Sequence, residues 1–208
     1  MQKVLFLIIL ALAIPMTAFA DGGVDFTNAG GTLTGTTSGL SLTGSTLIAV
    51  SGLNGGGLIT GNNLGSFGFS TGALLTGTLK DGGTFAGGGS FTVTGNGTNG
   101  VPSGVLFQGT FSGPVSWTLV TLGNGTHNYT LTGVLAGTLG SGSTTNGVTI
   151  QLTINTGTGY FTGSAKISSG DTNVVVPEPS SLTLIGGGML VLAGVLRRRL
   201  TLGRLNLG

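Results

Sequence analysis

The chain has 208 residues, a formal net charge of +2 at pH 7 and only 6% charged residues. It contains no cysteine, which excludes disulfide bonds, thiolate metal sites and a cysteine nucleophile. Five of the seven basic residues are Lys3 and four arginines beyond residue 196, so residues 21–176 carry two lysines against four aspartates, a net charge of −2. This middle part has no arginine, and its charge excludes a basic surface for nucleic acid.

The first 20 residues have the layout of a secretory signal peptide. Lys3 provides the positive start, Val4 to Ile14 form an apolar stretch, and Ala18-Phe19-Ala20 is an A-x-A cleavage site. We expect cleavage after Ala20, with Ala18 and Ala20 as the recognised positions, so the mature chain would begin at Asp21. The protein is therefore expected to be exported.

Residues 21–176 are predicted to form one extracellular β domain rich in glycine and threonine. The whole chain has 44 glycines. Glycine is a poor helix former and threonine is β-branched, so this composition disfavours helices. The apolar residues follow no sustained helical spacing, whereas alternation of apolar and polar residues is common.

Alternation is clearest in the second half of this domain, from about Gly88. The apolar positions that we expect to share a face within each strand are Phe91 and Val93; Val105, Phe107, Gly109 and Phe111; Val115, Trp117 and Leu119; Tyr129, Leu131, Gly133, Leu135, Gly137 and Leu139; Ile150, Leu152 and Ile154; and Phe161, Ala165 and Ile167. Residues 21–87 are less regular, and we expect them to pair as additional edge strands.

Turn signals separate these strands. Asp81-Gly82 is one, and Asn-Gly occurs at Asn54-Gly55, Asn96-Gly97, Asn99-Gly100, Asn124-Gly125 and Asn146-Gly147. Such pairs supply the positive φ values of type I′ hairpin turns. The clearest hairpins are expected at Asn124-Gly125 and Asn146-Gly147, because both lie between alternating runs.

The fold class that follows is all-β, an antiparallel β-sandwich or barrel with strands of about 5 to 10 residues. The alternative architecture is a parallel β-solenoid, which Gly/Thr-rich runs such as 31–36 and 74–79 would suit. A solenoid has a fixed repeat, and the TLTG-like fragments at 32–35 and 130–133 recur at irregular spacing. A disordered low-complexity segment is a further alternative, which the regularly spaced large apolar residues oppose.

Residue types that carry catalysis are nearly absent from this domain. His127 stands alone near a predicted turn and is interpreted as a surface polar residue, and Lys80-Asp81 is interpreted as a solvated hairpin tip. The four aspartates are scattered, so we expect no catalytic residues, no metal site, no cofactor and no enzymatic activity. Trp117 is a candidate sugar-stacking platform, but its position on the face of Val115 and Leu119 favours the core.

Three Asn-x-Thr sequons, at Asn96, Asn124 and Asn128, are consistent with surface loops and glycosylation.

The C-terminal segment combines three features in a fixed order. Pro177-Glu178-Pro179 is expected to be extended, because proline fixes φ and prevents a continuous helix. An apolar run at 182–196 follows and is predicted to be a transmembrane helix, although it is shorter than the roughly 20 residues that span a bilayer comfortably. The cluster Arg197-Arg198-Arg199 then stops transfer and stays cytoplasmic, so residues 21–176 lie outside. A short tail, 200–208, ends the chain.

This order of features resembles the PEP-CTERM sorting domain, and the resemblance covers 177–199. It implies recognition and cleavage at Pro177, Glu178 and Pro179 by an exosortase, a membrane-embedded cysteine protease. It also implies anchoring by the C-terminal hydrophobic helix before processing, then localisation at the cell surface or in the extracellular matrix of a bacterium that makes exopolysaccharide.

The functional prediction is an exported, non-enzymatic cell-surface or exopolysaccharide-matrix protein. Its expected partners are the exosortase and the membrane, with exopolysaccharide as a further candidate and no nucleic acid. The alternative is a polysaccharide- or ice-binding surface module, because Thr-x-Thr ladders occur at 32–36, 76–78, 92–94 and 130–132. Such ladders also arise wherever threonine fills the solvent face of a strand, and a secreted hydrolase is the least favoured reading.

Overall fold

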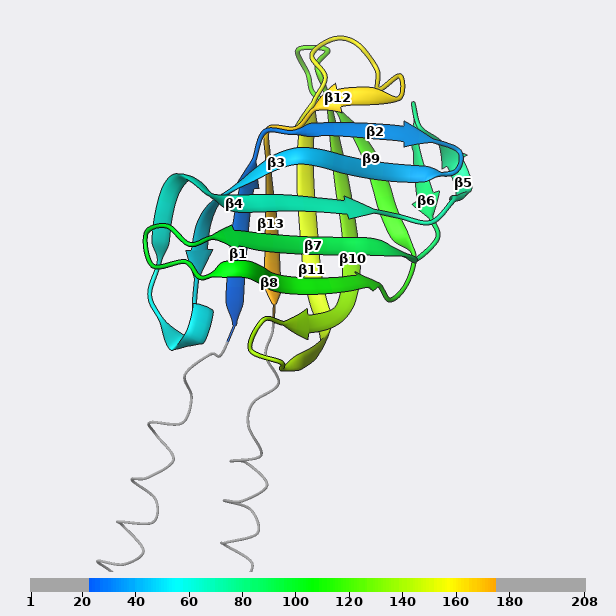
Figure 1. The fold of residues 1–208 in the computed structure, drawn as a ribbon. Coiled ribbons are helices and arrows are strands. Elements are labelled where there is room, and N and C mark those ends of the chain that lie inside the picture. The colour runs from blue at the N-terminus through cyan, green and yellow to red at the C-terminus, as the bar shows by residue number, and fades with distance from the viewer. Residues whose placement is uncertain (1–22, 175–208) are drawn as a thin grey trace, which may run out of the picture. The chain divides into compact units, whose positions relative to one another are not determined.

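The structure is a computed structural model that describes residues 23–174. These residues form a nearly all-β unit of antiparallel strands (Figure 1). The strands are β1 (Val24–Ala29), β2 (Thr32–Thr36), β3 (Gly39–Ser51), β4 (Ile59–Ser70), β5 (Leu74–Thr78), β6 (Gly82–Phe85), β7 (Gly88–Asn96), β8 (Ser103–Phe111), β9 (Val115–Thr121), β10 (His127–Leu139), β11 (Thr144–Asn155), β12 (Ser164–Lys166) and β13 (Ser169–Val174). A short 3₁₀ turn, η2 (Leu53–Gly55), joins β3 to β4.

Eight of the strands close into an antiparallel barrel. Their order is β11-β13-β1-β3-β4-β7-β8-β10, and β10 pairs again with β11. The prediction of an antiparallel sandwich or barrel is confirmed, and the parallel solenoid does not describe residues 23–174. The predicted C-terminal helix lies outside the described residues.

The barrel is flattened into two layers whose strands cross. In Figure 1, β2, β3, β4, β7 and β8 run across the front, and we call them, with β12, the front sheet. Behind them, β1, β13, β11, β10 and β9 run crosswise; with β6 and β5 they form the back sheet. This is the orthogonal arrangement, in which strands that bend from one sheet into the other form the corners.

Two long strands make these corners. β3 pairs with β2 through its first half and with β1 through its second half. β10 pairs with β9 at 127–132 and with β8 at 135–139. Both strands have 13 residues, more than the predicted 5 to 10, because each belongs to both sheets.

The seam between β8 and β10 depends on a pair of facing glycines. Gly109 lies opposite Gly137, and a Cβ on Gly137 would lie 2.3 Å from the Gln108 carbonyl oxygen and 2.7 Å from the Phe107 ring. Two backbones can approach this closely only where side chains are absent. The glycine pair therefore helps to close the barrel.

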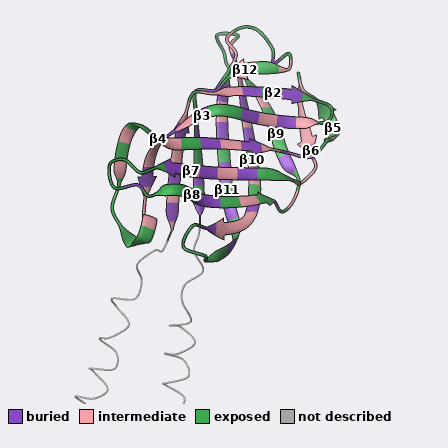
Figure 2. Ribbon diagram, viewed as in Figure 1, coloured by how far each residue is buried: buried purple, intermediate pink, exposed green. Residues whose placement is uncertain are grey.

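Buried and exposed residues alternate along most strands (Figure 2). The predicted inward positions of β9 and β11 are confirmed, since Val115, Trp117, Ile150, Leu152 and Ile154 are all buried. The prediction for Val105 is wrong, because it is 44% exposed while Leu106 is buried. The pairing of β7 with β8 shifts register at this point, so Leu106 is a bulge residue that reverses the direction of Val105.

The interior contains two aromatic clusters. Phe91 lies at the centre of the first, with ring centroids 5.0 Å from Phe67 and 5.8 Å from Phe107. Trp117 and Tyr129 form the second, stacked at 4.8 Å. Burial of such rings supplies stabilisation that a cysteine-free domain cannot obtain from disulfides.

The first half contributes more than the predicted edge strands. β1, β3 and β4 are members of the closed barrel, whereas β2, β5 and β6 lie outside it. The expectation of additional edge strands is therefore wrong for the first three. Bulges and register shifts in β3 and β4 obscure their alternation in the sequence.

Two Asn-Gly pairs form the predicted type I′ geometry. Asn54 and Asn99 each have φ of 53°, and the following glycines also have positive φ. The turns are closed by backbone hydrogen bonds of 2.9 Å, one from Gly56 N–H to the Leu53 carbonyl and one from Val101 N–H to the Thr98 carbonyl. They connect β3 to β4 and β7 to β8.

Asn124-Gly125 confirms the predicted hairpin between β9 and β10 but not its turn type. Only Gly125 has a positive φ, and its N–H bonds the Leu122 carbonyl. Asp81-Gly82 likewise lies in a hairpin, between β5 and β6.

Asn146-Gly147 is not a turn, and that prediction is wrong. Leu135 pairs with Val148 and Ala136 with Asn146, so Gly147 is an extra residue inside β11. The β10–β11 turn lies earlier, where Leu139 N–H bonds the Ser143 carbonyl at 2.9 Å. A glycine with positive φ serves a bulge as well as a turn, so the dipeptide alone does not distinguish the two.

Candidate functional site

The residues predicted to direct sorting lie outside the described part of the chain. This applies to the signal-cleavage residues Ala18 and Ala20, to Pro177, Glu178 and Pro179, to the helix 182–196, to Arg197, Arg198 and Arg199, and to the tail 200–208. Within residues 23–174, no helix is long and apolar enough to cross a membrane.

Trp117 is a core residue, as its position in the alternation predicts. Its side chain is 1% exposed and packs edge-on against Phe161 at 5.3 Å. The indole N–H donates a 2.9 Å hydrogen bond to the Leu79 carbonyl. The indole therefore has no open face on which a sugar ring could stack.

His127 is buried, and the interpretation of a surface histidine is wrong. The side chain is 6% exposed and its Nδ1 lies 2.9 Å from Thr121 Oγ1. The imidazole stacks on the ring of Tyr160 with centroids 4.1 Å apart. The turn that precedes His127 suggested exposure, but the loop that carries Tyr160 folds over it.

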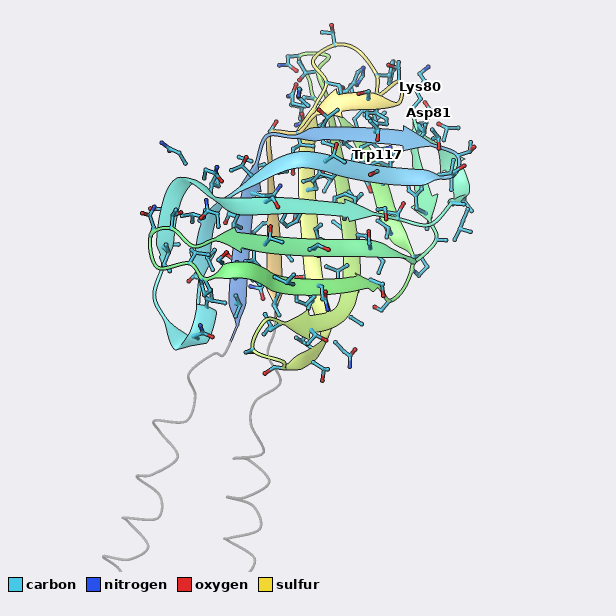
Figure 3. All side chains as sticks on the ribbon, in the orientation of Figure 1. Lys80, Asp81 and Trp117 are labelled. Atoms are coloured by element: carbon cyan, nitrogen blue, oxygen red, sulfur yellow. The ribbon has the colours of Figure 1, made fainter. Side chains whose placement is uncertain are left out.

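Lys80 and Asp81 lie near the end of the molecule that carries β12, with Trp117 deeper inside (Figure 3). The Lys80 ammonium lies 4.4 Å from the Tyr160 ring centroid. His127 occupies one face of that ring, so the ammonium covers the other. Asp81 accepts a 2.9 Å hydrogen bond from Thr78 Oγ1. The tip is thus more tightly fixed than the predicted solvated hairpin.

Tyr129 connects this tip to the core. Its hydroxyl donates to the Lys80 carbonyl and accepts a 3.1 Å hydrogen bond from Phe161 N–H. Burial raises the pKa of Tyr129, the Phe161 hydrogen bond opposes the rise, and negative charge at Asp81 and Tyr160 adds to it. These contacts keep the phenol neutral and structural.

An aspartate pair lies on the outer face of the back sheet. Asp25 in β1 and Asp171 in β13 are neighbours there, and Thr27 Oγ1 donates to Asp171 at 3.4 Å. Burial, then the negative charge of Asp171 and a hydrogen bond with it, raise the pKa of Asp25 to about 6, against a smaller lowering by the Phe26 N–H. Sequence reasoning missed this pair because the two residues lie at opposite ends of the domain.

The predicted threonine ladders lie on the outer surface. Thr34, Thr94 and Thr132 alternate with buried residues of the same strands. Register joins them to polar residues on neighbouring strands, most of which carry hydroxyl groups. One row crosses the front sheet at Ser164, Thr34, Ser41, Ser70 and Ser90. Another crosses the back sheet at Thr76, Thr84, Ser116, Thr132, Gln151, Asp171 and Thr27.

The Asn124 sequon lies in the β9–β10 loop, and the Asn96 sequon begins at the last residue of β7 and continues into the β7–β8 loop. The Asn96 and Asn124 side-chain oxygens accept hydrogen bonds from the Thr98 and Thr126 hydroxyls at 2.6 and 2.7 Å. Asn128 lies inside β10, where its side-chain oxygen accepts a bond from Asn155. The expectation of surface loops is therefore wrong for Asn128.

Across residues 23–174, no group of three or more histidine, aspartate or glutamate side chains could hold a metal ion. Apart from Lys166 in β12, which donates to Thr32, the ionisable side chains of residues 23–174 lie in two places. Lys80, Asp81, His127, Tyr129 and Tyr160 gather at one end of the barrel, where each makes a structural contact. The aspartate pair borders the hydroxyl-bearing face.

Comparison with known proteins identifies the C-terminal segment. The described residues define a β-barrel domain whose outer surface carries rows of polar side chains. Residues 175–199 match the PEP-CTERM protein-sorting motif, so the predicted resemblance is confirmed. The chain is thus an exported protein sorted by an exosortase. No curated protein and no solved structure matches the chain.

Proposed function

We propose that the chain is a non-enzymatic protein of the bacterial cell surface or exopolysaccharide matrix. The observation that carries this proposal is the sorting motif at 175–199. On export, the 182–196 segment holds the protein in the membrane until the exosortase cuts at or near Pro177-Glu178-Pro179. The domain then remains at the surface or enters the matrix.

The non-enzymatic role rests on how the few reactive side chains are used. His127 is stacked and hydrogen-bonded, and Lys80 is held over an aromatic ring. His127 pairs with Thr121 at the start of β10, whereas Asp171 pairs with Gln151 of β11. The histidine and the aspartate pair therefore lie at different places in the sheet and do not support a nucleophile–base arrangement.

Processing is tested by cell fractionation followed by mass spectrometry of both termini. The mature protein should begin at Asp21 and lack 182–199. Glu178→Ala should leave the uncut, membrane-anchored form. Matrix-associated protein with 182–199 still attached would contradict the cleavage proposal.

Polysaccharide binding is the second candidate function, and the hydroxyl rows on the outer surface favour it. Because the sheet closes on itself, its outer surface curves. A curved surface suits a polymer chain better than the flat face of an ice crystal. Of the two ligands considered for a binding module, polysaccharide and ice, we therefore favour polysaccharide.

A further inference from the structure

Two of the hollows on the outer surface of residues 23–174 have several polar side chains in their lining, and most of these side chains are bonded differently in the two. The front hollow, of about 360 Å³, lies over β3, β4 and β7. There Ser66 and Thr94 bond each other at 2.6 Å, and Asn96 donates to the Asn63 carbonyl at 2.8 Å. These polar groups already have partners within the protein.

The second hollow, which we call the back groove, lies over β9, β10, β11 and β13 and measures about 470 Å³. Its polar lining includes Thr132, Thr149, Gln151 and Asn173, all of them exposed. Within residues 23–174, none of these four side chains makes a hydrogen bond to the protein. Their donors and acceptors therefore face solvent and are available to a ligand.

Strand register arranges the lining in rows across the groove. Ser116 lies opposite Thr132, Thr132 opposite Gln151, and Gln151 opposite Asp171. Neighbouring strands lie roughly 4.8 Å apart, so this row is about 14 Å long. One polar side chain per strand gives a spacing close to the length of a pyranose ring. A row of hydroxyl, amide and carboxylate groups matches the hydroxyls of an extended glycan.

The charge of the groove indicates which glycans fit. Asp171 lines it and Asp25 lies beside Asp171, with Asp25 Oδ1 buried and unbonded among the described residues. No lysine lines the groove. Carboxylates accept hydrogen bonds from sugar hydroxyls but repel uronates and phosphates. The lining also has no aromatic ring, so recognition depends on hydrogen bonds and not on stacking.

We propose that the back groove binds an uncharged, hydroxyl-rich polysaccharide. This inference rests on polysaccharide binding, the second proposed function, and assigns that binding to the back groove and to uncharged polysaccharides. Gln151 and Asn173 bind sugar hydroxyls through their amides, Thr132 and Thr149 through their hydroxyls, and Asp171 accepts from a hydroxyl at the end of the row.

The test is affinity electrophoresis of the full chain in a mild detergent. The gels contain hydroxyethylcellulose, dextran or galactomannan as neutral probes, and alginate as the acidic probe. We expect retardation by at least one neutral polymer, with an apparent Kd at least tenfold lower than for alginate. A preference for alginate, or no retardation by any neutral polymer, would overturn the ligand assignment.

Paired variants separate the two faces. Gln151→Ala/Asn173→Ala should weaken retardation at least tenfold, and Ser66→Ala/Thr94→Ala tests the competing front hollow. Gln151, Asn173 and Ser66 are exposed and Thr94 is partly buried, and circular dichroism of each variant checks that the fold is kept. If the front variant alone loses binding, polysaccharide binding stands and the back groove is wrong. If neither variant loses polysaccharide binding, the assignment to the back groove is also wrong. The processing experiment is independent of all these outcomes.

Discussion

Replacement of Trp117 by alanine should remove a large share of the stability of residues 21–176. The side chain is 1% exposed, stacks on Tyr129 at 4.8 Å and packs against Phe161 at 5.3 Å. Truncation of large aromatic residues in cores costs roughly 3 to 5 kcal/mol. The Leu79 carbonyl would also lose its indole donor, which places Trp117→Ala towards the upper end of that range. Domains are held by roughly 5 to 15 kcal/mol, so the variant should be close to unfolding.

The measurement is urea unfolding of residues 21–176 followed by far-UV circular dichroism, whose β-rich signal also checks the fold. Trp117→Phe is the control: it keeps an aromatic ring and loses the hydrogen bond, so it should cost about 1 to 3 kcal/mol. Wild-type emission should be blue-shifted and resistant to acrylamide. A stable Trp117→Ala variant, together with red-shifted and quenchable wild-type emission, would refute the core assignment and restore the sugar-platform interpretation.

Two further predictions concern the barrel seam and pH. Gly137→Ala should destabilise the fold by roughly 1 to 3 kcal/mol, because the added Cβ overpacks against the Gln108 carbonyl. The control, Gly113→Ala, should be nearly neutral, because no atom lies within 4 Å of its added Cβ. Equal urea unfolding midpoints for the two variants would contradict the role of the glycine pair at the seam. The folded-state pKa of Asp25, about 6, lies above its ordinary value of 3.8, so its contribution to stability is complete below pH 3.8 and lost as pH rises through 6. Asp25→Asn should therefore reduce the fall in melting temperature between pH 4 and pH 7, and an unchanged profile would show that Asp25 titrates normally.

The local structure of the second half follows from the sequence because each strand there has one buried face. Simple alternation predicts the inward positions of Trp117 and Leu152, and both residues are buried. Alternation fails where a bulge inserts a residue, as at Leu106, because one extra residue turns every following side chain to the other face. A bulge also accounts for Asn146-Gly147, because the positive φ of Gly147 suits a bulge as well as the predicted turn.

The order of strands in the barrel depends on where β3 and β10 bend. Each bend divides one strand between two partners. Closure also needs pairs of strands that are not consecutive in the sequence, such as β1 with β13 and β8 with β10. Closure removes most of the free strand edges that an open sheet would expose. Such long-range pairings leave no local pattern, so the sequence alone does not distinguish a sandwich from a barrel.

In the candidate site, too, the sequence predicts which residues lie on the strand surface but not which residues strand pairing brings together. The ladders at Thr92/Thr94 and Thr130/Thr132 were visible in the sequence, but threonine also favours strands simply because it is β-branched. What separates a structural hydroxyl from one available to a ligand is its hydrogen-bond partner. Thr94 is bonded to Ser66 across the front sheet, whereas Thr132 faces Gln151 in a groove without a side-chain partner among residues 23–174. The hydroxyls most suited to binding are therefore those that strand pairing places together but leaves unbonded, and only the three-dimensional register identifies them.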